Sequence, residues 1–256
     1  MLINTLLVFL KHLLPISFIC VFWIIHTHPE SNKFYLKFTA NLFLCGLLLQ
    51  FIWYFLLPIL IKNQGLELLR ITLYALFLCS SIYLSIIIIS GIESKKLTNR
   101  FWFLSLTLLI LIYVSDIQLY FISLSNPVFF MLSFFLGILM GIGICISFMI
   151  LSLVILKQLI AKFQWLSHLL LVIFIAGQSL HLINSLFQMD IISAQVPLWN
   201  SDTIVSENSE WGYFLGAMTG YESTPTLWHL LDYLLMLTIP YLGLFISKYS
   251  NRGALK

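Results

Sequence analysis

The chain has 256 residues, of which 61% are hydrophobic and only 9% are charged, with a mean hydropathy of +1.02. Because a soluble domain carries about 25% charged residues, this composition excludes a soluble globular protein and predicts an all-α integral membrane protein. The net charge of +3 comes from basic residues scattered between apolar runs, which gives no indication of nucleic-acid binding.

Apolar runs of about 20 residues mark helices that span a membrane. Seven such runs follow one another in a single polytopic domain, residues 1–256, with short connections except for one long polar segment. They cover about residues 3–27, 35–61, 67–91, 101–124, 129–156, 163–188 and 227–247. The first run is expected to be a helix and not a signal peptide, because Lys11 and His12 interrupt it and no small-x-small cleavage site follows.

The basic residues predict the orientation of these helices. If the N-terminus lies outside, the inner segments hold ten Lys and Arg residues and the outer segments hold two, Lys62 and Arg70. Because basic residues collect on the cytoplasmic side, the chain is expected to be N-out and C-in. Residues 189–226 then form an extracytoplasmic loop with five acidic residues and no Lys or Arg. Such a loop either collects cations or is simply solvated, with its bases excluded by the orientation rule.

Two charged residues stand near the middle of apolar runs. Lys11 is about nine residues from the outer start of the first run, and Asp116 is about eight from the outer end of the fourth. At 1.5 Å per residue, both lie roughly 12–14 Å below the outer boundary. A lone charge at this depth costs at least about 2.5 kcal/mol, so we expect Lys11 and Asp116 to form an ion pair, with His12 beside them. The pair either fixes helix packing or belongs to a transport path.

The equal depth of these charges in the first and fourth runs predicts a 3+3 inverted repeat followed by a C-terminal helix. Gln178, His181 and Asn184 recur at i, i+3 and i+6 in the sixth run, so they share one helix face. That face makes either interhelical hydrogen bonds or part of a polar path with Lys11 and Asp116. The sequence contains no catalytic dyad and no H-E-x-x-H motif, so no enzymatic activity is predicted.

Three stretches of the C-terminal half carry a family likeness: FLGILMGIGICISFMILSLVIL, FQWLSHLLLVIFIAGQSLHLINSLFQ and PLWNSDTIVSENSEWGYFLGAMTGYESTPTLWHLLDYL. The third combines Leu-Trp-Asn, a Ser-Glu-x-Ser stretch, Gly-Tyr and Pro-Thr-Leu in a specific order. Over about residues 129–245 the chain resembles the high-affinity iron permease family, the bacterial and fungal transporters of iron or lead. The seven-span, N-out plan agrees with that family.

The resemblance implies iron transport across the plasma membrane, in bacteria the inner membrane. Iron would be the transported substrate, without a covalently bound cofactor, and an oxidase or a periplasmic iron-binding protein would be the partner. The family carries Arg-Glu-Gly-x-Glu in its first and fourth helices, where this chain reads LKHLL and SDIQL. Lys11 and Asp116 thus replace the first glutamates, Leu14 and Leu119 replace the second, and both arginines are absent. Arg70 stands where the third helix usually has an acid.

Asp116 is therefore the one surviving carboxylate of the family's midplane site. The resemblance adds Asp202, Glu207 and Glu210 of the acidic loop as outer metal contacts, and Ser206 or Ser209 is expected to cap a short helix that begins near Glu210. Two functions stay open. One is an iron transporter with an altered midplane site, in which Lys11, His12, Asp116, Gln178 and His181 line the path. The other is a non-transporting, degenerate permease that acts as a structural or regulatory membrane subunit.

Overall fold

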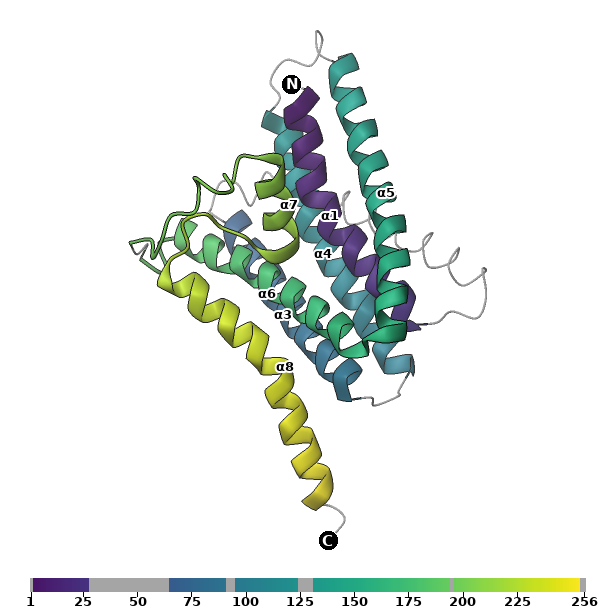
Figure 1. Ribbon diagram of the computed structural model, residues 1–256. Helices are drawn as coiled ribbons and strands as arrows, with labels where there is room; N and C mark the ends of the chain where they lie inside the picture. Colours follow the sequence, from purple (N-terminus) through teal and green to yellow (C-terminus); the bar gives the residue numbers. More distant parts are fainter. Residues whose placement is uncertain (1, 28–64, 91–94, 124–130, 194–195, 254–256) are drawn as a thin grey trace.

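The computed structural model describes residues 2–27, 65–90, 95–123, 131–193 and 196–253. Within these ranges the protein is all-helical, with seven α-helices and no β-strand (Figure 1). The helices are α1 (Leu2–Thr27), α3 (Gly65–Ser90), α4 (Lys95–Ser123), α5 (Met131–Lys162), α6 (Gln164–Gln188), α7 (Glu210–Thr219) and α8 (Leu227–Gly253).

Six of the predicted spans overlap helices, namely α1, α3, α4, α5, α6 and α8. Their ends differ in places: α4 begins at Lys95, before residue 101, and α5 ends at Lys162, after residue 156. The second predicted span, residues 35–61, lies outside the described residues. Five helices, α1, α3, α4, α5 and α6, are long and apolar enough to cross a membrane. The chain is thus a multi-pass, all-α membrane protein. The five do not include α8, so the crossing of the membrane by residues 227–247 stays a prediction, as does the orientation.

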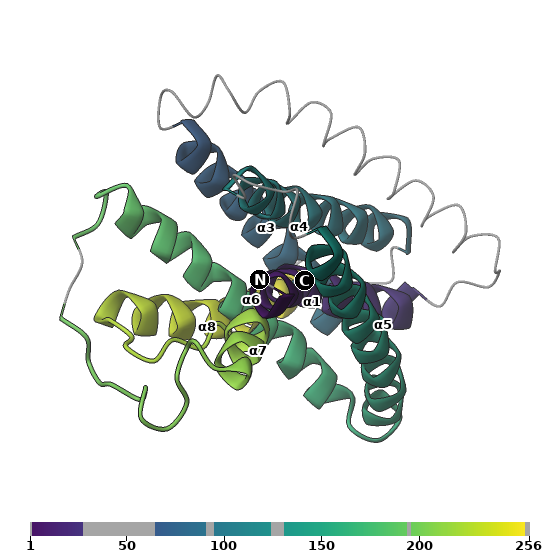
Figure 2. The ribbon, with the colours of Figure 1, turned by 90° about the horizontal axis from the view of Figure 1, so that it is seen from above.

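The core lies where α1, α3, α4 and α6 meet. Large apolar side chains from all four helices are fully buried there, among them Phe22, Phe77, Trp102, Leu109 and Phe174. α5 packs along α1 at the periphery of the bundle, as the view from above shows (Figure 2). It exposes apolar side chains such as Leu139, which is 71% exposed. An exposed apolar face of this kind suits contact with lipid chains.

The predicted inverted repeat relates the first helix to the fourth and the third to the sixth. α1 contacts α4, and α3 contacts α6, as helices related by such an axis would. The partner of α5 in this scheme is the second predicted span, which lies outside the described residues. The repeat therefore stays a prediction.

The acidic loop is partly helical, as expected. Ser209 is the N-cap of α7, in an extended conformation, and its side chain accepts a hydrogen bond of 3.0 Å from the backbone nitrogen of Gly212. The predicted cap is thus confirmed. α7 ends at Gly220, whose φ of 69° lies in the left-handed region that favours glycine.

α7 lies against α1 and α6, so the acidic segment folds back onto the bundle (Figure 1). Gly177 of α6 and Gly220 make this close approach possible. A Cβ atom added to Gly177 would lie 2.5 Å from the carbonyl carbon of Thr219, and one added to Gly220 would lie 2.6 Å from the Cα of Gly177. Gly177 is therefore a backbone contact point between α6 and α7.

Candidate functional site

Asp116 of α4 forms an ion pair with Arg70 of α3. Its other carboxylate oxygen lies 3.8 Å from Nδ1 of His12 on α1. The Asp116 side chain is 12% exposed and the Arg70 side chain 28%. The interior carboxylate is thus compensated, as its position inside an apolar helix requires.

The predicted partner of Asp116 was wrong. Lys11 forms no ion pair with Asp116 in the part of the chain that the structure describes; Arg70 takes that place. Lys11 and His12 are neighbours in α1, so their side chains point about 100° apart around the helix axis. Of the two, His12 is directed at Asp116. The packing of α3 against α4 brings in the guanidinium group of Arg70.

A polar cavity of about 360 Å³, here called the central cavity, surrounds this ion pair. It lies among α1, α3, α4 and α6. Its lining residues are Lys11, His12, Arg70, Tyr74, Tyr113, Asp116, His181, Asn184, Ser185 and Gln188. The rings of His12 and Tyr113 lie 5.4 Å apart, and those of Tyr74 and His181 lie 6.1 Å apart. Four of the predicted site residues, Lys11, His12, Asp116 and His181, therefore share one cavity.

Gln178 has a different role from the one predicted for the path. Its Oε1 accepts a hydrogen bond of 2.6 Å from the hydroxyl of Tyr113, and its Nε2 donates one of 3.0 Å to the carbonyl of Ala217. Gln178 is fully buried. It joins α4, α6 and α7, which agrees with the alternative of interhelical hydrogen bonding. The other two residues of the predicted face, His181 and Asn184, line the central cavity.

A second polar cavity, here called the outer cavity, has a volume of about 280 Å³. It lies between α1, α6, α7 and the segments on either side of α7. Lys11, His181 and Asn184 line both cavities, and Glu207 and Glu222 line only the outer one. The two cavities thus adjoin at three shared residues; Glu207 and Glu222 line one of them and Asp116 lines the other.

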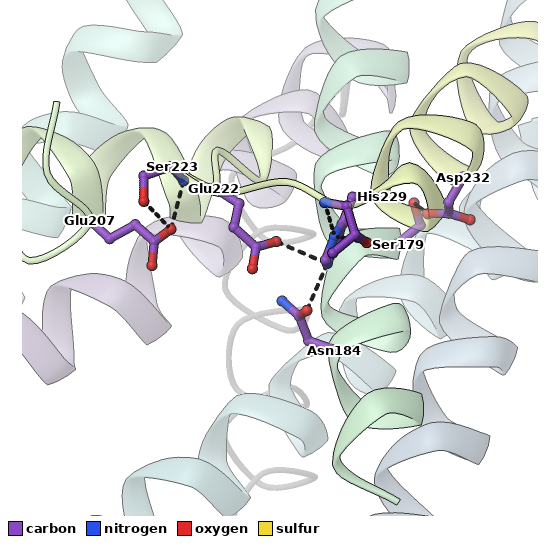
Figure 3. A network of polar contacts seen from close by, with 8 residues as sticks. Ser179, Asn184, Glu207, Glu222, Ser223, His229 and Asp232 are labelled. Atoms are coloured by element: carbon purple, nitrogen blue, oxygen red, sulfur yellow. Dashed lines mark hydrogen bonds and ion pairs between the residues drawn. The ribbon is translucent and has the colours of Figure 1, made fainter. Parts of the chain in front are cut away.

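Next to the outer cavity, a hydrogen-bond network joins α6, α8 and the segment between α7 and α8 (Figure 3). Nε2 of His229 lies 2.8 Å from Oδ1 of Asn184 and 2.9 Å from Oε2 of Glu222. The backbone nitrogen of Thr226 donates to Nδ1 of His229 at 3.1 Å, so the imidazole proton is assigned to Nε2. An Nε2 that carries this proton donates to its neighbours and is not free to bind a metal.

His229 and Asp232 were not among the site residues predicted from the sequence. The hydroxyl of Ser179 on α6 donates to Oδ2 of Asp232 on α8 at 2.5 Å, and Figure 3 shows this contact beside His229. Both residues interrupt the last apolar run three positions apart, so they share a helix face. That spacing is the same signal that identified His181 and Asn184, and it could have found them.

The four tentative metal ligands are not assembled into one site. Asp116 lies in the central cavity, and of the three loop acids only Glu207 lines the outer cavity. Oε1 of Glu207 accepts hydrogen bonds from the backbone nitrogen and the hydroxyl of Ser223, at 2.6 and 2.8 Å. Asp202 and Glu210 are exposed. Within the described ranges, no group of three His, Cys, Asp or Glu residues is arranged to hold a metal ion.

Comparisons of the chain with protein-family models, with curated proteins and with solved structures find no match. The resemblance to the iron permease family therefore stays a prediction based on the quoted motifs.

Proposed function

We propose that this chain is a membrane transporter of the iron-permease type, which moves iron across the plasma membrane along the two polar cavities. The observation that supports this best is that the cavities adjoin at Lys11, His181 and Asn184, inside a bundle of apolar helices. Polar and ionisable groups in a membrane interior are costly, and those that face a bundle interior or a water-filled cavity mark substrate and ion paths.

The path begins at the outer cavity, which is lined by Glu207 and Glu222 of the acidic segment. It continues past Asn184 and His181 to Asp116. In this conformation the carboxylate of Asp116 forms an ion pair with Arg70. Transport then requires Arg70 to release the carboxylate, so the ion pair acts as a closed gate. An exchange of charge partners of this kind suits alternating access between two helix bundles.

A second candidate is the non-transporting, degenerate permease that acts as a structural or regulatory membrane subunit. The ion pair between Arg70 and Asp116 favours it, because the carboxylate is already neutralised. Iron ions require several oxygen, nitrogen or sulfur ligands, and Arg70 and Lys11 provide none while they are protonated.

Uptake of labelled iron into liposomes that contain the purified protein separates the two candidates. Asn184→Leu keeps the side-chain size but removes the polar group shared by both cavities, so it should abolish most of the uptake. Thr72→Val, on the exposed surface of α3, is the matched control and should transport normally. Absence of uptake by the folded wild-type protein would contradict the transporter and leave the subunit, which should then co-purify with a membrane or periplasmic partner.

A further inference from the structure

The polar segment that precedes α7 exposes large apolar side chains, although it lies outside the apolar runs. Val196 is 85% exposed and Ile204 is 83% exposed. Both lie in the stretch between α6 and α7, and two residues at the start of α8 are exposed in the same way. Six residues make up what is here called the outer apolar patch: Val196, Leu198, Trp199, Ile204, Leu227 and Trp228.

Hydrogen bonds hold the two parts of the patch together. The backbone nitrogen of Leu198 donates to the carbonyl of Pro225 at 2.8 Å, and that of Ser201 donates to the carbonyl of Ser223 at 2.9 Å. The backbone nitrogen of Ile204 donates to the carbonyl of Ser201 at 2.9 Å, which closes a turn. Figures 1 and 2 show this segment beside the start of α8, at the periphery of the bundle. Exposed apolar residues gathered in this way mark a surface that contacts a partner or a membrane.

The patch lies at the depth where α6 leaves the membrane. The span of α6 ends at Gln188. Nε2 of His229, in the first turn of α8, lies 2.8 Å from Oδ1 of Asn184, which is four residues, or about 6 Å, before that end. The ring of His229 also lies 5.3 Å from that of Phe187 in the last turn of α6. The first turn of α8 is therefore level with the membrane boundary, and so is the segment that is hydrogen-bonded beside it.

The chemistry of the patch suits the boundary between lipid and water. Tryptophan is enriched at this boundary, and the patch contains Trp199 and Trp228. Below Leu227, α8 exposes Leu231 and Leu234 at spacings of four and three residues, so one apolar helix face continues away from the patch. Residues 189–226 contain five acidic residues and no Lys or Arg. Because basic residues attract anionic lipids, this segment suits headgroups without net charge.

We propose that the outer apolar patch is a lipid-binding surface, which lies in the headgroup region of the leaflet that α6 reaches at Gln188 and prefers lipids without net charge. This proposal goes beyond the proposed function and does not depend on iron transport. The patch is joined to the outer cavity, because the hydroxyl of Tyr221, which lines that cavity, donates to the carbonyl of Val205 at 2.9 Å. Lipid contact at the patch therefore fixes one wall of the outer cavity at the membrane surface.

Fluorescence quenching of single labelled cysteines in phosphatidylcholine nanodiscs tests the proposal. Bimane is attached to Val196→Cys or Ile204→Cys in a chain whose native cysteines are replaced by serine. Both positions are exposed, so the label should not disturb packing. Asn208→Cys, an exposed polar position of the same segment, is the matched control. Leu139→Cys, on the exposed apolar face of α5, calibrates quenching from the lipid side.

A nitroxide on the phospholipid headgroup should quench positions 196 and 204 at least about twofold more strongly than position 208, since apolar side chains at a membrane interface lie about 5–10 Å deep. Aqueous iodide should give the reverse order. Iodide quenching at positions 196 and 204 as strong as at 208, or headgroup quenching no stronger than at 208, would overturn the proposal. The patch would then face water and be open to a soluble protein partner.

The same labelled variants test the preference for lipids without net charge. Addition of phosphatidylglycerol to the nanodiscs should leave the headgroup quenching at position 204 unchanged or lower it, because the acidic segment repels an anionic surface. Stronger quenching with phosphatidylglycerol would overturn this preference.

Discussion

At the scale of single residues, the ion pair between Arg70 and Asp116 compensates a carboxylate that lies inside the bundle, so the stability of the protein should depend on it. Removal of one partner of a buried pair leaves an uncompensated charge, which typically costs about 3–5 kcal/mol. Since the Arg70 side chain is 28% exposed, we expect the lower end of this range for Arg70→Met. The melting temperature of the purified protein in detergent measures the effect.

The double variant Arg70→Met with Asp116→Leu removes both charges together. It should melt closer to the wild type than Arg70→Met does, because no buried charge is left alone. A double variant that loses as much stability as the sum of its single variants would contradict a direct coupling of the two residues. Lys11→Met should be milder than Arg70→Met, since Lys11 is exposed to the cavities and does not pair with Asp116.

The sequence located the interior charge but not its partner. Counting residues from the span ends predicted that Asp116 lies inside the bundle and is compensated, which is confirmed. The identity of the partner depends on the rotation of α1, which turns His12 and not Lys11 toward Asp116, and on the packing of α3 against α4. Local hydropathy predicts neither the rotation of α1 nor the packing of α3 against α4. His229 and Asp232 were missed although their spacing carried a usable signal.

At the scale of elements, the contact between α6 and α7 depends on Gly177. Gly177→Ala should destabilise the protein by about 1–3 kcal/mol, because the new methyl group meets the backbone at Thr219 and Gly220. Gly143→Ala on α5 is the matched control, since nothing lies within 4 Å of its added Cβ atom. Thermal unfolding midpoints of the two variants check the expectation. Equal midpoints would show that α7 is not held by this close approach.

The N-cap of α7 offers a milder perturbation of the same element. Ser209→Ala removes the acceptor for the backbone nitrogen of Gly212 and should cost about 1 kcal/mol. Because the loss is local, we expect faster hydrogen exchange of the α7 amides and unchanged exchange in α4. Uniform acceleration in both helices would contradict a local role. This cap was predictable because capping is set by neighbouring residues, whereas docking of α7 depends on Gly177, which is distant in sequence.

At the scale of the whole molecule, the all-α membrane class follows from composition, and the positions of the long helices, though not their ends, follow from the apolar runs. What composition does not determine is which helices enclose polar space. α5 and α6 are both long and apolar, yet α5 exposes Leu139 and Ile150 while α6 places His181 and Asn184 at the cavities. That difference arises because α6 packs against α3, α7 and α8, whereas α5 packs mainly along α1.

The account as a whole requires a polar path that opens to the outer side through the outer cavity. The accessibility of single cysteines to a membrane-impermeant thiol reagent in intact cells measures this directly. The background is a chain in which Cys20, Cys45, Cys79 and Cys145 are replaced by serine. Asn184→Cys, at the junction of the cavities, should react from outside, and Ala176→Cys, fully buried two turns away on the same helix, should not. No reaction at position 184 from outside, or equal reaction at both positions, would contradict the path.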